Sequence, residues 1–268
     1  MRGRFPLIRI IAGDMKKILI LGGTTEARLL AAKLAARGDL DITLSLAGRT
    51  ENPVEQPVPV RVGGFGGARG LADWLVEHET DLLIDATHPY AARISANAAE
   101  AARIAGVPIL ALCRPGWAPV AGDRWTLVDN AEEAVAALGE ASRRVFLALG
   151  RQEVAAFETA PQHGYVIRSV DPIEPALGVP DASYILARGP FSEVDERALL
   201  EAYRIEVIVA KNSGGQATYG KIAAARQLGI EVILFRRPQL PDVPSAPSVS
   251  AMAEMVDHFA TPVEKRGV

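Results

Sequence analysis

The sequence predicts an α/β fold in which parallel sheets are covered by helices on both faces. Short runs rich in Ile, Leu and Val, bounded by Gly or Pro, alternate with Ala-rich stretches of helical length. Strands buried on both faces are near-continuously apolar, and four of the five runs in the first half have this character. A composition of 49% hydrophobic and 23% charged residues over 268 positions suits one large or two ordinary globular domains.

The first half of the chain contains the elements of a complete sheet. Strands are expected at 17–22, 41–46, 58–63, 81–86 and 107–112. Helices are expected at 25–37, 68–79 and 90–105. The last of these helices has so many Ala residues that it must pack close to the sheet. Residues 1–14 precede Met15 and the first strand, and we expect them to be an N-terminal extension.

A connector and a second α/β set follow. RPGWAPVAGD, residues 114–123, holds three Pro or Gly positions in its first six residues, which is typical of a domain boundary. Strands are expected at 144–150, 165–170, 183–188, 206–211 and 231–236, helices near 131–139, 152–158, 192–203, 218–228 and 250–259, and a Pro-rich loop at 238–249. The pattern predicts two similar-sized domains that face one another, residues 15–123 and residues 124–268.

Composition excludes several classes of function. A net charge of -3 and a pI near 5.9 argue against a nucleic-acid partner. Cys113 is the single cysteine, so no intramolecular disulfide can form, and a reducing cytoplasm is the expected location. No apolar run approaches the roughly 20 residues of a membrane span. HExxH, GxSxG and Cys/His ligand spacings are absent, so we expect no metal site.

The first strand leads into a turn that is typical of phosphate binding. In GGTTEA, Gly22 and Gly23 let the backbone approach a pyrophosphate, while Thr24 and Thr25 offer hydroxyls and amides at a helix N-terminus, with Glu26 in its first turn. The turn predicts a dinucleotide site. It is not the strict GxGxxG pattern, and the alternative is a capped strand–helix corner.

The ends of the next two strands refine this prediction. Where NAD-selective domains place an acid for the ribose 2′-hydroxyl, this chain has LAGRT. Ser45, Arg49 and Thr50 would suit a 2′-phosphate, which favours NADP; the alternative is a solvated surface Arg49. VGGFGG, which includes Gly64, follows the third strand, where the backbone would pass close to the adenosine or nicotinamide end. A flexible loop is the alternative there.

DATHPYA follows the fourth strand, at the edge where open α/β sheets bind ligands. It gathers Asp85, Thr87, His88 and Tyr90, which makes these residues candidates for catalysis and cofactor contact. The alternatives are that Asp85 and Thr87 cap the next helix, that His88 is structural and that Tyr90 is ordinary packing.

In the second half, each expected strand ends in cationic or polar residues. Together these strand ends predict a site for a polycarboxylate or phosphate ligand, although solvated charges at strand ends are common. The most specific segment is KNSGG, in which glycines free the backbone next to polar side chains and a lysine. The candidate ligand-binding residues are Arg151, Arg188, Lys211, Asn212, Ser213, Gly214, Tyr219 and Lys221.

Six segments taken together resemble the precorrin-6A reductase family of cobalamin biosynthesis. They are ILILGGTTEARLLA, DATHPYA, CRPGW, FLALGRQE, ILARGPF and VIVAKNSGGQATYGKIAAARQLGIEVILFRRP, and they span Met15 to Pro238 in the expected order. The resemblance implies two Rossmann-like domains with parallel sheets that face a shared cleft. It implies NADPH as the cofactor, and reduction of precorrin-6A to precorrin-6B or of the cobalt-containing counterpart in the anaerobic route. The second domain would bind the tetrapyrrole polycarboxylate, and hand-over to other pathway enzymes is possible.

Such a reduction needs a hydride and a proton. His88 and Tyr90 are the candidates for orientation and proton delivery, supported by Asp85 or Thr87, with Lys211 and Tyr219 across the cleft. Water or a substrate carboxyl group could also supply the proton. Two rival functions remain at this point. One is an NADP-dependent dehydrogenase of a small carbonyl substrate, although position 94 is Ile and a Tyr-x-x-x-Lys pair is absent at Tyr90. The other is a non-catalytic NADP-sensing module.

Overall fold

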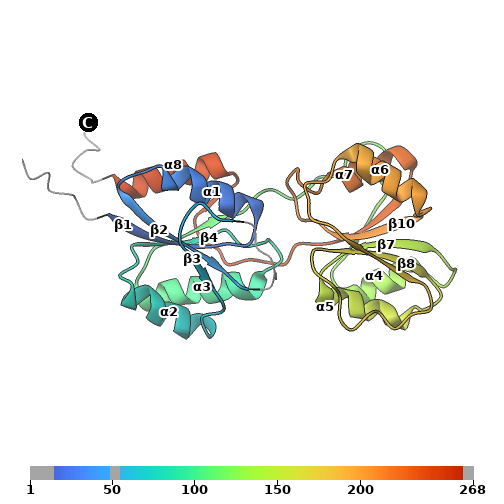
Figure 1. The fold of residues 1–268 in the computed structure, drawn as a ribbon, viewed down its shortest axis with the longest axis horizontal. Helices are drawn as coiled ribbons and strands as arrows, with labels where there is room; N and C mark the ends of the chain where they lie inside the picture. Colours follow the sequence, from blue (N-terminus) through green and yellow to red (C-terminus); the bar gives the residue numbers. More distant parts are fainter. Residues whose placement is uncertain (1–14, 49–54, 262–268) are drawn as a thin grey trace, which may run out of the picture. The chain divides into compact units, whose positions relative to one another are not determined.

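The structure, a computed structural model, describes residues 15–48 and 55–261, and these form two compact units. One unit contains residues 15–48, 55–113 and 241–261, and the other contains residues 114–240. Each is a six-stranded sheet with helices on both faces, and all of the strand pairs are parallel (Figure 1). The predicted α/β class is confirmed.

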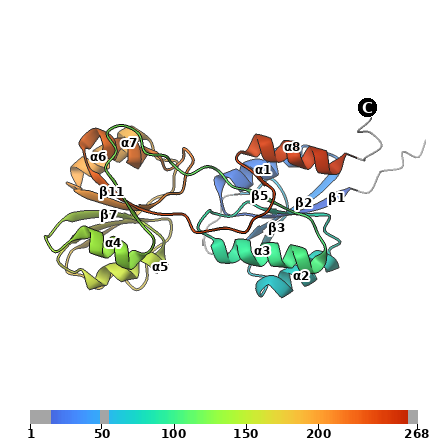
Figure 2. The same cartoon turned by 180° about the vertical axis from the view of Figure 1, so that it is seen from behind.

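The first unit has the strand order β12-β5-β4-β1-β2-β3. Its strands are β1 (Lys16–Leu21), β2 (Leu40–Leu46), β3 (Val60–Val62), β4 (Leu82–Asp85), β5 (Ile109–Leu112) and β12 (Ser245–Ala246). Its helices are α1 (Thr25–Ala35), α2 (Gly67–Glu77), α3 (Ala92–Ala105) and α8 (Val249–Ala260). Helices α1 and α8 cover one face, and α2 and α3 cover the other (Figures 1 and 2).

The central strand β1 explains why the sequence pattern is continuously apolar. Ile18 and Ile20 are buried in the cluster formed with α1 and α8, whereas Leu19 and Leu21 are buried in the cluster formed with α2 and α3. Successive side chains point to opposite faces of a strand, so Ile18 to Leu21, where β1 is covered on both faces, are all buried. The neighbouring strand β4 is buried at all four positions for the same reason.

The expected domain boundaries are wrong at both ends of the second domain. Strand β12 pairs with β5, and α8 packs on α1, so residues from 241 onward belong to the first unit. The connector from 114 onward belongs to the second unit. The physical reason is burial: Ala246, Met252 and Val256 complete the core on the α1 face of the first sheet.

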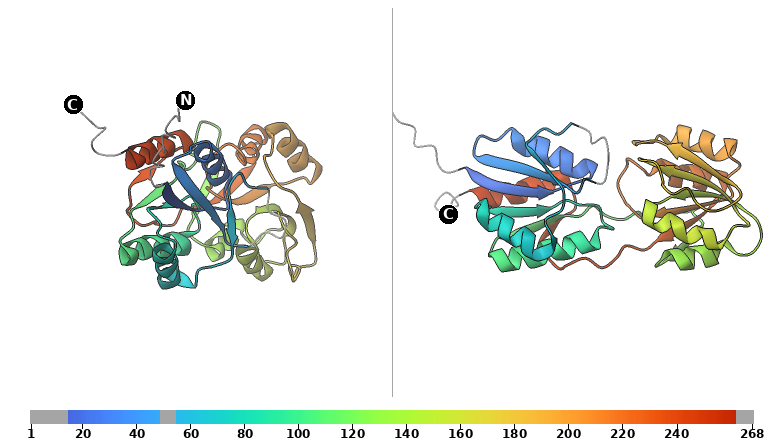
Figure 3. Two further views of the ribbon diagram at one scale, coloured as in Figure 1. Left: turned by 60° about the vertical axis from the view of Figure 1, so that its left-hand side comes forward. Right: turned by 60° about the horizontal axis from the view of Figure 1, so that its bottom comes forward.

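The second unit has the strand order β6-β11-β10-β7-β8-β9. Its strands are β6 (Trp125–Val128), β7 (Arg144–Ala148), β8 (Gly164–Ser169), β9 (Ala182–Leu186), β10 (Val207–Lys211) and β11 (Glu231–Phe235). Its helices are α4 (Ala131–Leu138), α5 (Arg151–Val154), the 3₁₀ helix η1 (Ala155–Thr159), α6 (Glu193–Ala202) and α7 (Gly220–Leu228). Helices α6 and α7 lie on one face, and α4 and α5 lie on the other (Figures 1 and 3).

Most predicted elements of both units are present with ends shifted by one or two residues. The exceptions are short edge strands and one helix. Strands β6 and β12 were not expected, and the helix expected at 152–158 is a single α-helical turn followed by η1. In the described part of the chain, no helix is both long enough and apolar enough to cross a membrane.

Candidate functional site

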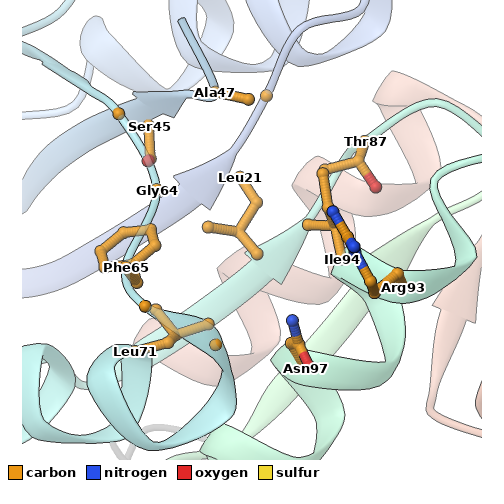
Figure 4. Close-up of a pocket in the computed structure, with 14 residues that line it drawn as sticks. Leu21, Ser45, Ala47, Gly64, Phe65, Leu71, Thr87, Arg93, Ile94 and Asn97 are labelled. Atoms are coloured by element: carbon orange, nitrogen blue, oxygen red, sulfur yellow. The ribbon is translucent and has the colours of Figure 1, made fainter.

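A pocket of about 490 Å³ opens at the carboxyl edge of the first unit's sheet. Because the carboxyl ends of parallel strands meet at one edge, loops far apart in sequence converge there. Its lining comes from the ends of β1 to β4 and from the starts of α2 and α3 (Figure 4): Leu21, Gly22, Ser45, Ala47, Gly63, Gly64, Phe65, Gly66, Gly67, Leu71, Thr87, Arg93, Ile94 and Asn97. Figure 4 shows Ser45, Gly64 and Phe65 on one side and Thr87, Arg93 and Asn97 on the other.

Four of the predicted cofactor-binding residues line this pocket: Gly22, Ser45, Gly64 and Thr87. Gly22, Gly64 and Thr87 follow β1, β3 and β4, and Ser45 is the last residue but one of β2. Packing favours glycine at position 22 as well, because a Cβ there would lie 2.7 Å from Leu44 Cδ1 and the Leu44 side chain would have to shift. Arg49 and Thr50, predicted to bind a 2′-phosphate, lie outside the described residues.

The rest of the GGTTEA turn is organised as a helix start beside the pocket. Thr24 is the N-cap of α1, where its Oγ1 accepts a hydrogen bond from the Ala27 N–H at 3.0 Å. The same hydroxyl donates to the Ala86 carbonyl at 2.9 Å, which ties the turn to the end of β4. Gly23, Thr25 and Glu26 are exposed or half-buried and are not among the lining residues of this pocket.

The DATHPYA segment forms a tight turn in which only Thr87 reaches the pocket lining. Asp85 is 7% exposed, and its Oδ1 accepts hydrogen bonds from the Thr87 N–H at 3.0 Å and from the Thr87 hydroxyl at 2.7 Å. The Tyr90 N–H donates to His88 Nδ1 at 3.3 Å, and the two rings lie 5.7 Å apart. Asp85 therefore orients Thr87. His88 and Tyr90 are half-buried beside the pocket.

Sequence reasoning missed the contribution of α3. Arg93 and Asn97 line the pocket one helical turn apart, together with Ile94. Residues four apart lie on the same face of a helix, so polar residues at this spacing just after DATHPYA were the signal available. Phe65 was also missed as a lining residue, although it lies inside the VGGFGG segment that was singled out.

The N-termini of two helices lie at the pocket. Helix α2 begins after Gly66 and α3 begins after Ala91, and neither of these N-cap residues makes a side-chain capping bond. A helix N-terminus carries partial positive charge and unpaired N–H groups. With the Arg93 guanidinium on the lining, this end of the sheet favours an anionic ligand.

In the second unit, the predicted KNSGG segment is fixed against residues 114–117. Asn212 Oδ1 accepts a hydrogen bond from the Trp117 N–H at 2.7 Å, and Asn212 Nδ2 donates to the Trp117 carbonyl at 3.0 Å. The Ser213 carbonyl accepts from Arg114 and Arg237. Gly214 has a φ of +67°, and a Cβ there would lie 2.0 Å from a backbone oxygen of the connector. The Asn212 side chain and the backbone of Ser213 and Gly214 therefore fix the shape of the loop.

The other predicted ligand-binding residues of this unit differ in exposure. Lys211 pairs with Glu153 at 2.5 Å. Arg151 and Arg188 are exposed at strand ends, and Arg151 donates to the Pro172 carbonyl at 2.8 Å. The Tyr219 hydroxyl accepts a hydrogen bond from Arg226 Nη2 at 2.6 Å.

Lys221 is the unexpected member of this set because it is 4% exposed. Its Nζ donates to the Thr218 carbonyl at 2.7 Å and lies 5.0 Å from the centroid of the Trp117 ring. The pKa of the Lys221 amine is lowered to about 7, mainly by burial and also by the nearby charge of Arg168, while Glu196 opposes the shift. Arg168 and Glu196 are themselves a buried, bidentate ion pair.

The comparisons with known proteins agree with this architecture. A model of the precorrin-6x reductase family, CbiJ/CobK, matches residues 17–260. The chain belongs to the precorrin-6x reductase family. Membership makes the protein an oxidoreductase of cobalamin biosynthesis, as the sequence resemblance implied.

Individual relatives in this family cover nearly the whole chain. A precorrin-6A reductase of Sinorhizobium sp is 59% identical over 251 residues, which are 94% of this chain and 96% of the relative. A solved structure titled CobK precorrin-6A reductase matches with a TM-score of 0.87 at 48% identity, over 93% of this chain and 99% of that one. A cobalt-precorrin-6A reductase of Priestia megaterium is 30% identical over 237 residues, 83% of this chain and 91% of the relative.

Proposed function

We propose that this protein reduces precorrin-6A to precorrin-6B and that NADPH binds at the carboxyl edge of the first unit's sheet. The observation that carries the cofactor proposal is the pocket that brings Gly22, Ser45, Gly64 and Thr87 together from four successive strand ends. A doubly wound sheet binds dinucleotides at this edge, so the prediction from four separate motifs and the position of the pocket agree.

The chemistry of the pocket supports a dinucleotide. Its volume of about 490 Å³ lies within the range of small-molecule sites, which is roughly 300 to 1,000 Å³. Glycine backbone at Gly22 and Gly64 permits close approach, and two helix N-termini with Arg93 favour phosphate groups. When bound, the nicotinamide would supply a hydride.

The residues of the chain would then position the reactants and manage one proton. Asp85 holds Thr87 at the pocket, and the half-buried pair of His88 and Tyr90 next to it is the candidate for proton delivery. Exposed Arg151 and Arg188 of the second unit are candidates for binding the carboxylates of the tetrapyrrole. The cleft between two facing domains remains a prediction.

The metal-free substrate is the preferred form in this proposal. The relative with 59% identity is named a precorrin-6A reductase, and the relative with 30% identity is named a cobalt-precorrin-6A reductase. Both forms would be reduced by the same hydride and proton addition, and the higher identity to the precorrin-6A reductase supports the metal-free form.

The decisive experiment mixes the purified protein with precorrin-6A and NADPH under anaerobic conditions. We expect NADPH oxidation in step with the change in the visible spectrum of the macrocycle, and slower turnover with NADH or with cobalt-precorrin-6A. NADPH binding without consumption would instead identify the sensing module. Consumption only with a small carbonyl substrate would identify the dehydrogenase.

A further inference from the structure

One wall of the pocket is a glycine-rich loop, residues 63–67, that follows the short strand β3. Gly63, Gly66 and Gly67 have φ values of +110°, +81° and +90°, in the left-handed region that favours glycine. Glycine-rich backbone loses more conformational entropy on ordering than other backbone does. A wall made of such a loop therefore needs contacts from outside the loop to keep one shape.

Arg61, on β3, supplies those contacts. Its Nη1 donates to the Gly63 carbonyl, and its Nη2 donates to the Gly64 carbonyl at 2.8 Å. Its guanidinium carbon lies 3.7 Å from the centroid of the Phe65 ring. One side chain thus holds three consecutive residues of the wall. The Phe65 ring also packs edge-on against Trp74 of α2 at 5.7 Å.

The strand register shows which part of the pocket this wall faces. Arg61 is paired with Ser45 across β3 and β2, and Ser45 lines the pocket. In dinucleotide-binding sheets, the end of the second strand contacts the adenosine ribose. The loop held by Arg61 is therefore on the adenosine side of the site.

We propose that Arg61 is a positioning residue that holds Phe65 and the glycine loop in the shape that accepts the adenosine half of the dinucleotide. Arg61 is not itself a lining residue, so it acts through Gly63, Gly64 and Phe65. The inference rests on the proposed function, because it assumes that the pocket binds NADPH.

Arginine is specifically suited to this position. A planar guanidinium stacks on an aromatic ring while its N–H groups donate in the ring-parallel plane to two acceptors. A lysine ammonium group is not planar and cannot donate to two acceptors in one plane while it stacks on a ring. Arg61→Lys should therefore keep the positive charge but no longer hold the glycine loop and Phe65 in place. Phe65→Leu removes the ring on which Arg61 stacks, so it should disturb the same wall of the pocket.

The test measures the affinity of three probes, NADPH, adenosine 2′,5′-bisphosphate and reduced nicotinamide mononucleotide, for wild type, Arg61→Lys, Phe65→Leu and the double variant. Each single variant should weaken the binding of NADPH and of the adenosine bisphosphate by about tenfold, because the wall that faces the adenosine half no longer keeps one shape. Affinity for the mononucleotide should stay within about twofold, since a free energy change near 0.4 kcal/mol is small. The double variant should lose no more than either single variant, because the residues act as one unit.

Arg69→Ala is the matched control, since Arg69 is a well-exposed arginine of α2 whose partner is Asp73 at 3.6 Å. It should bind all three probes as wild type does. Unchanged affinity of Arg61→Lys for the adenosine bisphosphate, additive losses in the double variant, or an equal loss for the mononucleotide would each overturn the positioning role. Failure of the wild type to bind NADPH would overturn the proposed function itself, so the two failures are distinguishable.

Discussion

Single side chains in the turn after β4 divide the work of the site. Thr87 lines the pocket. One carboxylate oxygen of Asp85 accepts hydrogen bonds from both the backbone N–H and the hydroxyl of Thr87, so Asp85 holds Thr87 in place. His88 and Tyr90 are packed against one another beside the lining. The alternative that Asp85 and Thr87 cap the next helix is wrong, because the N-cap of α3 is Ala91 and makes no side-chain capping bond. A catalytic role stays a prediction for Asp85, His88 and Tyr90.

His88→Ala should lower the single-turnover rate of NADPH oxidation at saturating precorrin-6A by about a hundredfold, the lower range for loss of general acid catalysis. Rapid-mixing absorbance measurements check this, and saturation separates chemistry from binding. His258→Ala is the control, because His258 is an exposed residue in the last turn of α8. A rate in His88→Ala equal to that of wild type would remove His88 from the chemistry.

At the scale of elements, the sequence predicts those strands and helices that are determined by a local hydrophobic pattern. Apolar runs locate the central strands because burial is nearly complete along them, and Ala-rich stretches locate most helices because each helix buries one face against its sheet. Strand β12 is two residues long, too short to show a period, and it exists because β5 offers it an edge. Strand β6 is likewise an edge strand, paired with β11. Their pairing depends on the tertiary structure.

The residues of the candidate site likewise fall into those that a local sequence pattern predicts and those that depend on the tertiary structure. Gly22, Ser45, Gly64 and Thr87 were predictable because special residues at strand ends converge in any parallel sheet. Arg93 and Asn97 were not predicted, since their role depends on how α3 is placed against the sheet. Nothing local marks Lys221 as buried, because a lysine in the first turn of a helix is normally solvated.

The lowered pKa of Lys221, in the first turn of α7, predicts how the free energy of unfolding depends on pH. Its pKa is about 7 in the folded protein and near the ordinary 10.5 in the unfolded chain, so between these values the unfolded chain binds more protons. The free energy of unfolding should therefore rise with pH from about 7 to 9.5, with a slope from this group of up to about 1.4 kcal/mol per pH unit. Below pH 7 this contribution to the slope disappears.

Urea unfolding of wild type and Lys221→Met across that pH range checks the prediction. The variant should show a shallower rise, because it has no amine to titrate. The range stops near pH 9.5 because burial also raises the pKa of Tyr165, to about 12, which acts at higher pH. Lys33→Met, at an exposed position in the last turn of α1, should keep the wild-type slope. Parallel slopes for Lys221→Met and wild type would contradict the assigned cause.

On the scale of the whole molecule, the chain builds its first unit from segments at both ends of the sequence. The second unit, residues 114–240, is inserted between β5 and β12. Helix α8 packs beside α1 on the same face of the sheet, and its Met252 and Val256 are fully buried with Ile18 and Leu30. The unit that carries the candidate cofactor pocket is therefore complete only when the last helix is in place.

Val256→Asp tests this dependence. It puts a carboxylate into the apolar cluster under α8, and an unpaired buried charge costs several kcal/mol. Hydrogen exchange should show lost amide protection in β1 and β4 and near wild-type protection in β7 and β10, and NADPH affinity should fall. Glu254→Gln, at an exposed position on the same helix, should leave protection and affinity unchanged. Equal loss of protection in both sheets would show that the two units unfold as one, and retained protection in β1 would show that the first sheet does not need α8.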